Sequence, residues 1–194
     1  MDYTEGTEQQ KSRRAKKMML WFGIISLSMS FAAFTSAYVV SRERPDWLAE
    51  FELPRAFVIG LLLIVISSIT MILAKRAIRS AQKTNGTLFL LTTIGLGIAF
   101  IWFQFRGFSE IISSYGYNFT GATSNPKTTF IYLIAVVHIA HVVAGLVALL
   151  VTLANHLRGK YFEERMLGLD LASTFWHFVD VLWIYLFLFF YFVR

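Results

Sequence analysis

The 194-residue sequence contains no cysteine, only three prolines and only 15% charged residues. Without cysteine the chain can form no disulfide, thiolate metal site, iron–sulfur cluster or covalent c-type haem link, and it has no cysteine nucleophile. Typical soluble domains carry about 25% charged residues, so this chain has few groups with which to cover a surface in water. The scarcity of charge indicates that lipid surrounds much of the protein.

Apolar residues make up 56% of the chain and form five long runs. The hydrocarbon core of a bilayer is about 30 Å thick and a helix rises about 1.5 Å per residue, so about 20 apolar residues cross it. The sequence therefore predicts an all-α fold, a polytopic membrane bundle of five transmembrane helices. Residues 1–17 are predicted to form a basic tail, and residues 18–194 a single domain. The predicted spans are residues 18–40, 56–74, 87–105, 129–154 and 171–193.

All 18 Lys and Arg residues lie outside the predicted spans, and their distribution between the two sides is uneven. Twelve lie in the N-terminal tail and in the second and fourth connections, whereas six lie in the other two connections and at the C-terminus. Because Lys and Arg accumulate in cytoplasmic loops, we predict a cytoplasmic N-terminus and a periplasmic C-terminus. This topology also explains the net charge of +6, and nucleic acid is not a predicted partner.

Ionisable side chains within the last two spans form the candidate site. Asp180 lies roughly 13 Å along the last span at about 1.5 Å per residue, near the middle of the bilayer. A charge there costs about 2.5–3.5 kcal/mol, so Asp180 is expected to face protein. His177 lies on the same helix face, and the fourth span carries His138 and His141 three residues apart. We predict a structural polar cluster of these four side chains, joining the two spans by interhelical hydrogen bonds.

The same four side chains are compatible with other chemistry. Asp and His side chains within a membrane can relay protons, two histidines on facing helices can ligate haem, and imidazoles with a carboxylate can hold a metal. Two other functions therefore stay open, a haem-b membrane anchor of a dehydrogenase and a proton-coupled transporter. No span is interrupted by glycine or proline in the way that a transporter's midplane substrate site often is.

The first span carries small residues at every fourth position, Ser28, Ala32 and Ser36. Small residues at this spacing allow two helix backbones to approach closely, which is how helices associate in lipid. This small face, defined by the three residues, predicts a tight contact with another helix.

The last span resembles the signature of cytochrome c oxidase subunit III, whose final helix usually reads Tyr-Trp-His-Phe-Val-Asp-Val-Val-Trp. Here residues 175–183 read Phe-Trp-His-Phe-Val-Asp-Val-Leu-Trp. In the fourth span, residues 138–142 resemble the family's His-Gly-Leu-His-Val, and the first and third spans can also be matched to family helices. The positions that carry the resemblance are Trp176, His177, Phe178, Val179, Asp180, Trp183, Gly145, Gln104 and Asp170, the last in place of a family glutamate.

Two positions depart from the family pattern. The family has a membrane glutamate where this sequence has Leu27, and a Gln-x-x-Glu pattern where this sequence has Gln104 followed by Gly107. The family glutamate is associated with a lipid cleft and with support of proton entry to the catalytic subunit. That role therefore cannot be assigned to Leu27.

The resemblance implies a non-catalytic subunit III of a bacterial haem-copper terminal oxidase, in its five-helix form, in the inner membrane. Such a subunit supports assembly, stability and lipid binding beside the oxygen-reducing chain in aerobic respiratory electron transport. The resemblance implies no haem, copper or catalytic residue in this chain, because these belong to partner subunits. The expected partners are catalytic subunit I, other oxidase subunits and bound phospholipid, and an oxidase of this kind can join a respiratory supercomplex. The small face is expected to meet the catalytic subunit or the lipid cleft.

Overall fold

The computed structural model describes residues 7–48, 52–119, 121, 124–161 and 166–193, and within them the chain forms five helices. All five are long and apolar enough to cross a membrane, which confirms the predicted fold class. The helices are α1 (Glu8–Ser41), α2 (Arg55–Arg79), α3 (Lys83–Tyr115), α4 (Pro126–Leu157) and α5 (Leu167–Phe192).

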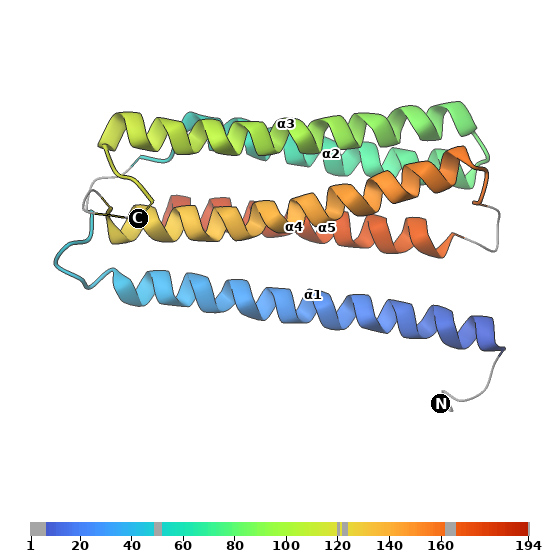
Figure 1. The fold of residues 1–194 in the computed structure, drawn as a ribbon, viewed down its shortest axis with the longest axis horizontal. Helices are drawn as coiled ribbons and strands as arrows, with labels where there is room; N and C mark the ends of the chain where they lie inside the picture. Colours follow the sequence, from blue (N-terminus) through green and yellow to red (C-terminus); the bar gives the residue numbers. More distant parts are fainter. Residues whose placement is uncertain (1–6, 49–51, 120, 122–123, 162–165, 194) are drawn as a thin grey trace.

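Four of the helices enclose a common core. In the described residues α2 packs against α3 and α5, and α4 packs against the same two helices. The first helix, α1, contacts only α4 and α5, and Figure 1 shows it running along one side of the other four. Of the polar side chains predicted for α4 and α5, His138 and Asp180 are buried, and α1 is attached to the flank of the four-helix group.

Successive helices run in opposite directions, as the predicted topology requires (Figure 1). The beginning of α1, the turn between α2 and α3, and the beginning of α5 lie together at one end of the bundle, termed here the tail end. Two of the basic residues counted for topology, Arg165 and Arg194, and residues 1–6 of the tail lie outside the described residues. Which end faces the cytoplasm stays a prediction from the charge distribution.

Local signals explain several helix ends. Thr7 and Gln10 form a capping box, in which each side chain bonds the other's backbone N–H and so satisfies donors left open at a helix start. This cap starts α1 ten residues before the predicted span, so the basic part of the tail continues the membrane helix. Asn125 caps α4 and Pro126 occupies its first turn. Gly116 ends α3 with a left-handed φ of 69°, a conformation that glycine adopts without strain.

The α1 helix contacts the bundle through large side chains. Its buried residues are Ile24, Phe31, Thr35 and Tyr38, which recur at the spacing expected of a single helix face. The small face of Ser28, Ala32 and Ser36 is exposed instead. Residues on another side of α1 therefore make its contact with the described bundle, and a tight contact of the small face with the catalytic subunit or the lipid cleft stays a prediction.

Candidate functional site: a polar cluster in the four-helix core

The α5 helix carries the signature residues into the core. Trp176, Asp180 and Trp183 are spaced four and three residues apart, so they share one face of the helix. All three side chains are at most 1% exposed. This burial agrees with the expectation that Asp180 faces protein and not the acyl chains.

Asp180 and His138 are ionisable groups with at most 1% of their surface exposed. The His138 ring on α4 stacks on Trp183, with ring centroids 5.1 Å apart, and meets the Phe100 ring edge-on. Neither ring nitrogen of His138 and neither carboxylate oxygen of Asp180 has a hydrogen-bond partner among the described residues. Gln104 of α3 is equally buried and its amide is also unpaired there. These three polar side chains come from three helices, and aromatic rings pack against one of them, His138.

Two neighbouring serines on α2 form hydrogen bonds with α5 in the membrane-spanning part of the bundle. The Trp176 indole N–H donates to Ser67 Oγ over 2.8 Å, and both side chains are buried. The Ser68 hydroxyl lies 2.6 Å from His177 Nδ1 and also lies near the Asp180 carboxylate. These bonds join α5 to α2, and sequence reasoning missed both serines. The one signal for these serines in the sequence was that two hydroxyl residues stand side by side in a mostly apolar span.

The predicted hydrogen bonds between α4 and α5 are not present in the described structure. His141 Nδ1 lies 2.7 Å from the backbone oxygen of Val137 on its own helix, and His177 bonds to α2. The Phe31 ring of α1 meets two of the α4 histidines edge-on, with ring centroids 6.3 Å from His138 and 6.0 Å from His141. The four predicted residues therefore lie in one region but do not bond to each other. His141 contacts its own helix, His177 bonds to α2, and His138 stacks on Trp183.

Two glycines allow the helices to approach the buried tryptophan. A Cβ atom on Gly97 of α3 would lie 2.7 Å from the Trp176 ring, and one on Gly145 of α4 would lie 3.0 Å from it. Both distances are too short for ordinary packing, so these positions require the absence of a side chain. Gly145, a signature residue, therefore acts through close packing against α5.

At the tail end, Asp170 joins α5 to α2 by charge. One oxygen of its carboxylate lies 2.9 Å from Lys75 Nζ and 2.8 Å from a guanidinium nitrogen of Arg79. The side chains are partly exposed, and ion pairs of this kind contribute about 0–1 kcal/mol each. Asp170, another of the positions that carry the family resemblance, thus holds the start of α5 against the end of α2.

The fourth histidine of the sequence, His156, lies against the start of α3. His156 is 8% exposed, and its Nε2 lies 3.1 Å from the backbone oxygen of Lys83 at the start of α3. Its ring also stacks on Tyr161. Helix α4 continues to Leu157, three residues beyond the predicted end of the span at residue 154. This extension brings His156 against α3.

A metal ion or a haem would need ligand side chains and free space in the polar cluster. Within the described residues, no group of three or more His, Asp or Glu side chains is placed to hold a metal ion. Aromatic side chains pack against the His138 ring, so protein occupies the space that a haem bound to it would need. Leu27, at the family's glutamate position, is half-buried and packs against the apolar core. The described residues of the cluster therefore do not fit a haem or a metal centre.

A family model described as "Cytochrome c oxidase subunit III" matches residues 5–194, which includes all five helices. The chain belongs to the cytochrome c oxidase subunit III family. Membership implies a membrane location and a complex with other oxidase subunits. It gives no support to a haem-b anchor or a proton-coupled transporter.

Individual subunit III proteins agree with this assignment. The chain is 27% identical over 176 residues to cytochrome c oxidase subunit 3 of the bacterium Alkalihalophilus pseudofirmus, covering 89% of this chain and 84% of that protein. It is 30% identical over 201 residues to subunit 3 of Drosophila yakuba, covering 95% of this chain and 73% of the relative. A third relative, from Spodoptera frugiperda, is 30% identical over 138 residues, covering 71% and 87%. The similarity thus includes both bacterial and animal members.

Proposed function

We propose that the chain is the non-catalytic subunit III of a haem-copper terminal oxidase in a bacterial inner membrane. It packs against catalytic subunit I and supports assembly and stability of the oxidase in aerobic respiration. The observation that carries the proposal is the family match over residues 5–194 of a chain that folds as five membrane-length helices. Haem and copper belong to the partner subunits in this proposal, and the donor set of the described core is consistent with that division.

The buried polar cluster has a structural role in this proposal. The bonds from α5 to Ser67 and Ser68, and the stacking of His138 on Trp183, fix the rotation of each helix about its own axis. Membrane hydrogen bonds contribute about 0.6 kcal/mol on average, so they specify geometry more than they add stability. A fixed geometry in turn gives subunit I a defined surface to bind.

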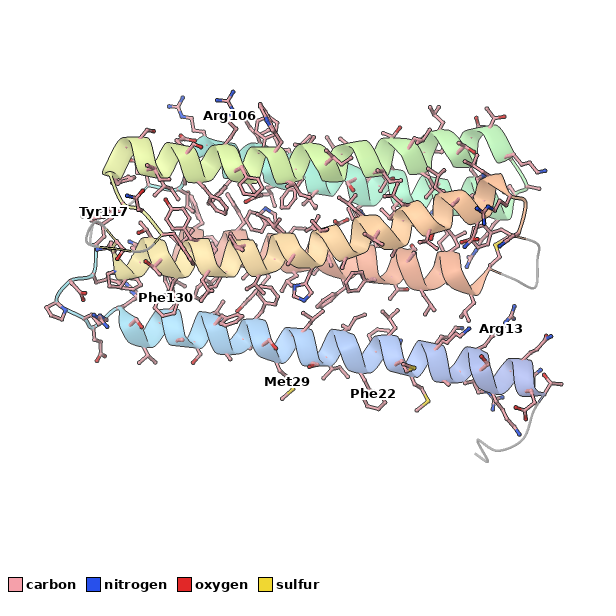
Figure 2. The ribbon with its side chains drawn as sticks, viewed as in Figure 1. Arg13, Phe22, Met29, Arg106, Tyr117 and Phe130 are labelled. Atoms are coloured by element: carbon pink, nitrogen blue, oxygen red, sulfur yellow. The ribbon has the colours of Figure 1, made fainter. Side chains whose placement is uncertain are left out.

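The outer surface of α1 is the surface that we assign to subunit I. Its small face is exposed, and the hydroxyl groups of Ser28 and Ser30 donate to backbone oxygens of their own helix. A partner helix can therefore approach this surface while both serine hydroxyls keep their acceptors within α1. Phe22 and Met29 point away from the other four helices on the same helix (Figure 2) and would add apolar contact area.

Copurification tests the assignment. An affinity-tagged chain is purified from membranes in mild detergent, and the accompanying chains and the optical spectrum are recorded. We expect the oxidase catalytic subunits and haem bands in the complex, and no haem band after the tagged chain is separated from its partners. Haem absorption that stays with the isolated chain, or a preparation without any oxidase subunit, would refute the proposal.

Phospholipid contact and membership of a supercomplex belong to the same proposal. Lipid is expected because α1 stands against only two helices and leaves exposed apolar residues on its other sides. Lipid analysis of the purified oxidase tests the first point. Native electrophoresis of gently solubilised membranes tests the second, since a supercomplex migrates above the oxidase alone.

A further inference from the structure

A polar pocket of about 330 Å³ lies at the tail end of the bundle, between three helices. It forms because α1 and α2 both contact α5 but do not contact each other in the described structure. Charged and polar groups contributed by all three helices line it together with three apolar side chains. The lining residues are Lys17, Leu20 and Trp21 of α1, Lys75 and Arg79 of α2, and Asp170, Leu171 and Thr174 of α5.

Positive charge exceeds negative charge in the pocket. Lys75 and Arg79 both pair with the same oxygen of Asp170. Lys17 adds a third cation, and Asp170 is the one carboxylate among the lining residues. An anion with a single negative charge and several acceptor oxygens, such as a phosphate group, would complement the excess charge.

The position of the pocket suits the headgroup region of a bilayer. Lys17 directly precedes the apolar part of α1, and Lys75 directly follows that of α2. Trp21 lies one helical turn further along α1 and is 57% exposed, as expected of a tryptophan at a membrane interface. Arg13 extends the basic surface of α1 towards its beginning (Figure 2). The pocket thus combines a basic opening with an apolar side that continues towards the hydrocarbon region.

We propose that this pocket binds the phosphate group of an anionic phospholipid, with the acyl chains continuing beside α1 and α5. Leu20, Trp21 and Leu171 favour a lipid over free phosphate, because they give apolar surface to a ligand that carries chains. This site specifies the lipid contact in the proposed function and rests on its membrane setting. It does not depend on assembly with oxidase subunits, so the two proposals can fail separately.

Native mass spectrometry of the full chain, released from detergent micelles with added lipid, tests the site. We expect dioleoylphosphatidylglycerol to be retained and dioleoylphosphatidylcholine to be lost. Neutralising Lys17 by Lys17→Gln should weaken retention of phosphatidylglycerol about fivefold, since a basic residue near an anionic surface contributes about 1 kcal/mol. Lys17 is exposed on α1, so the fold should tolerate the change. Equal retention of the two lipids would overturn the proposal.

Matched variants separate the pocket from general surface charge. Lys16→Gln removes the cation next to Lys17, and Arg76→Gln removes one three residues before Arg79. Neither Lys16 nor Arg76 lines the pocket. We expect both variants to retain phosphatidylglycerol as the unchanged chain does, whereas Arg79→Gln should weaken its retention as Lys17→Gln does. Equal losses in all four variants would overturn the pocket, as would displacement of the lipid by millimolar inorganic phosphate, which would indicate a site for free anions.

Discussion

Gly97 shows how strongly a single Cβ atom bears on the core. A methyl group there would meet the ring of Trp176 at 2.7 Å and the side chain of Leu146 at 2.9 Å. Because both neighbours are parts of a packed core, we expect Gly97→Ala to destabilise the protein by about 1–3 kcal/mol, the usual cost of overpacking. Thermal unfolding of the purified chain in detergent measures the effect.

Gly95, two residues earlier on the same helix, is the control for this change. It is exposed, and a Cβ atom there would meet nothing within 4 Å. Gly95→Ala should leave stability unchanged or raise it by about 0.5–1 kcal/mol, since alanine favours the helix. If the two alanine variants lost stability equally, the close approach at Trp176 would not be the cause.

The hydrogen bond between Ser67 and Trp176 gives a second prediction. Ser67→Ala removes the acceptor of the Trp176 indole N–H, which is fully buried and so loses its hydrogen-bond partner. We expect a loss of about 0.6–1.7 kcal/mol, the range for hydrogen bonds between membrane helices. Chemical unfolding followed by tryptophan fluorescence measures it. Ser30→Ala, which removes a hydroxyl bonded only to its own helix, should have a smaller effect.

The burial of Asp180 could be predicted, but its surroundings could not. The depth of Asp180 in an apolar run and the cost of charge in lipid required it to face protein. Which protein groups it meets depends on how far each helix is rotated about its axis, and the mostly apolar span of α2 leaves that rotation open. The contacts of Ser67 and Ser68 with α5 therefore emerged only from the three-dimensional packing.

At the scale of the element, α1 is the least enclosed of the five helices and its position depends on Phe31. This side chain is 1% exposed and meets the rings of His138 and His141 on α4. Phe→Ala costs about 3–5 kcal/mol in soluble cores, but lipid can cover the site here, so the loss should be smaller. We expect Phe31→Ala to loosen α1 while the other four helices keep their packing.

Spin labels can report this loosening, because the natural chain has no cysteine to interfere. Labels at Met29→Cys on α1 and Val181→Cys on α5 occupy exposed positions. The distribution of distances between them should broaden when Phe31→Ala is added. Phe22→Ala, which removes an exposed ring from the same helix, should leave the distribution narrow. Broadening by both changes would show that Phe31 has no special role.

The existence and order of the helices followed from apolar length alone, but the packing face of α1 did not. The repeat of Ser28, Ala32 and Ser36 suggested a tight contact, yet the same helix carries aromatic residues on another side. Both patterns fit helical periodicity, and only the three-dimensional packing decides which one meets α4 and α5. The early start of α1 likewise depends on its cap, since polar residues 8–17 give no hydropathy signal.

At the scale of the whole molecule, the tail end and the opposite end differ in charge. Twelve of the 18 Lys and Arg residues belong to the tail end by sequence position, and six belong to the other. The fold agrees with this division because successive helices alternate in direction (Figure 1). The alternating direction of the helices determines which segments lie on the same side of the membrane. The accumulation of Lys and Arg in cytoplasmic segments predicts which of the two sides is the cytoplasm.

Cysteine labelling in intact cells tests this orientation. Single cysteines are introduced as Ser80→Cys at the tail end and Ser124→Cys before α4, both at exposed positions. A maleimide that cannot cross the inner membrane should label Ser124→Cys at once, because that position is predicted to face the periplasm. Ser80→Cys should be labelled only after the membrane is opened, and the unchanged chain should not be labelled at all. The reverse pattern would place the basic end in the periplasm, so the lipid pocket would then face the outer leaflet.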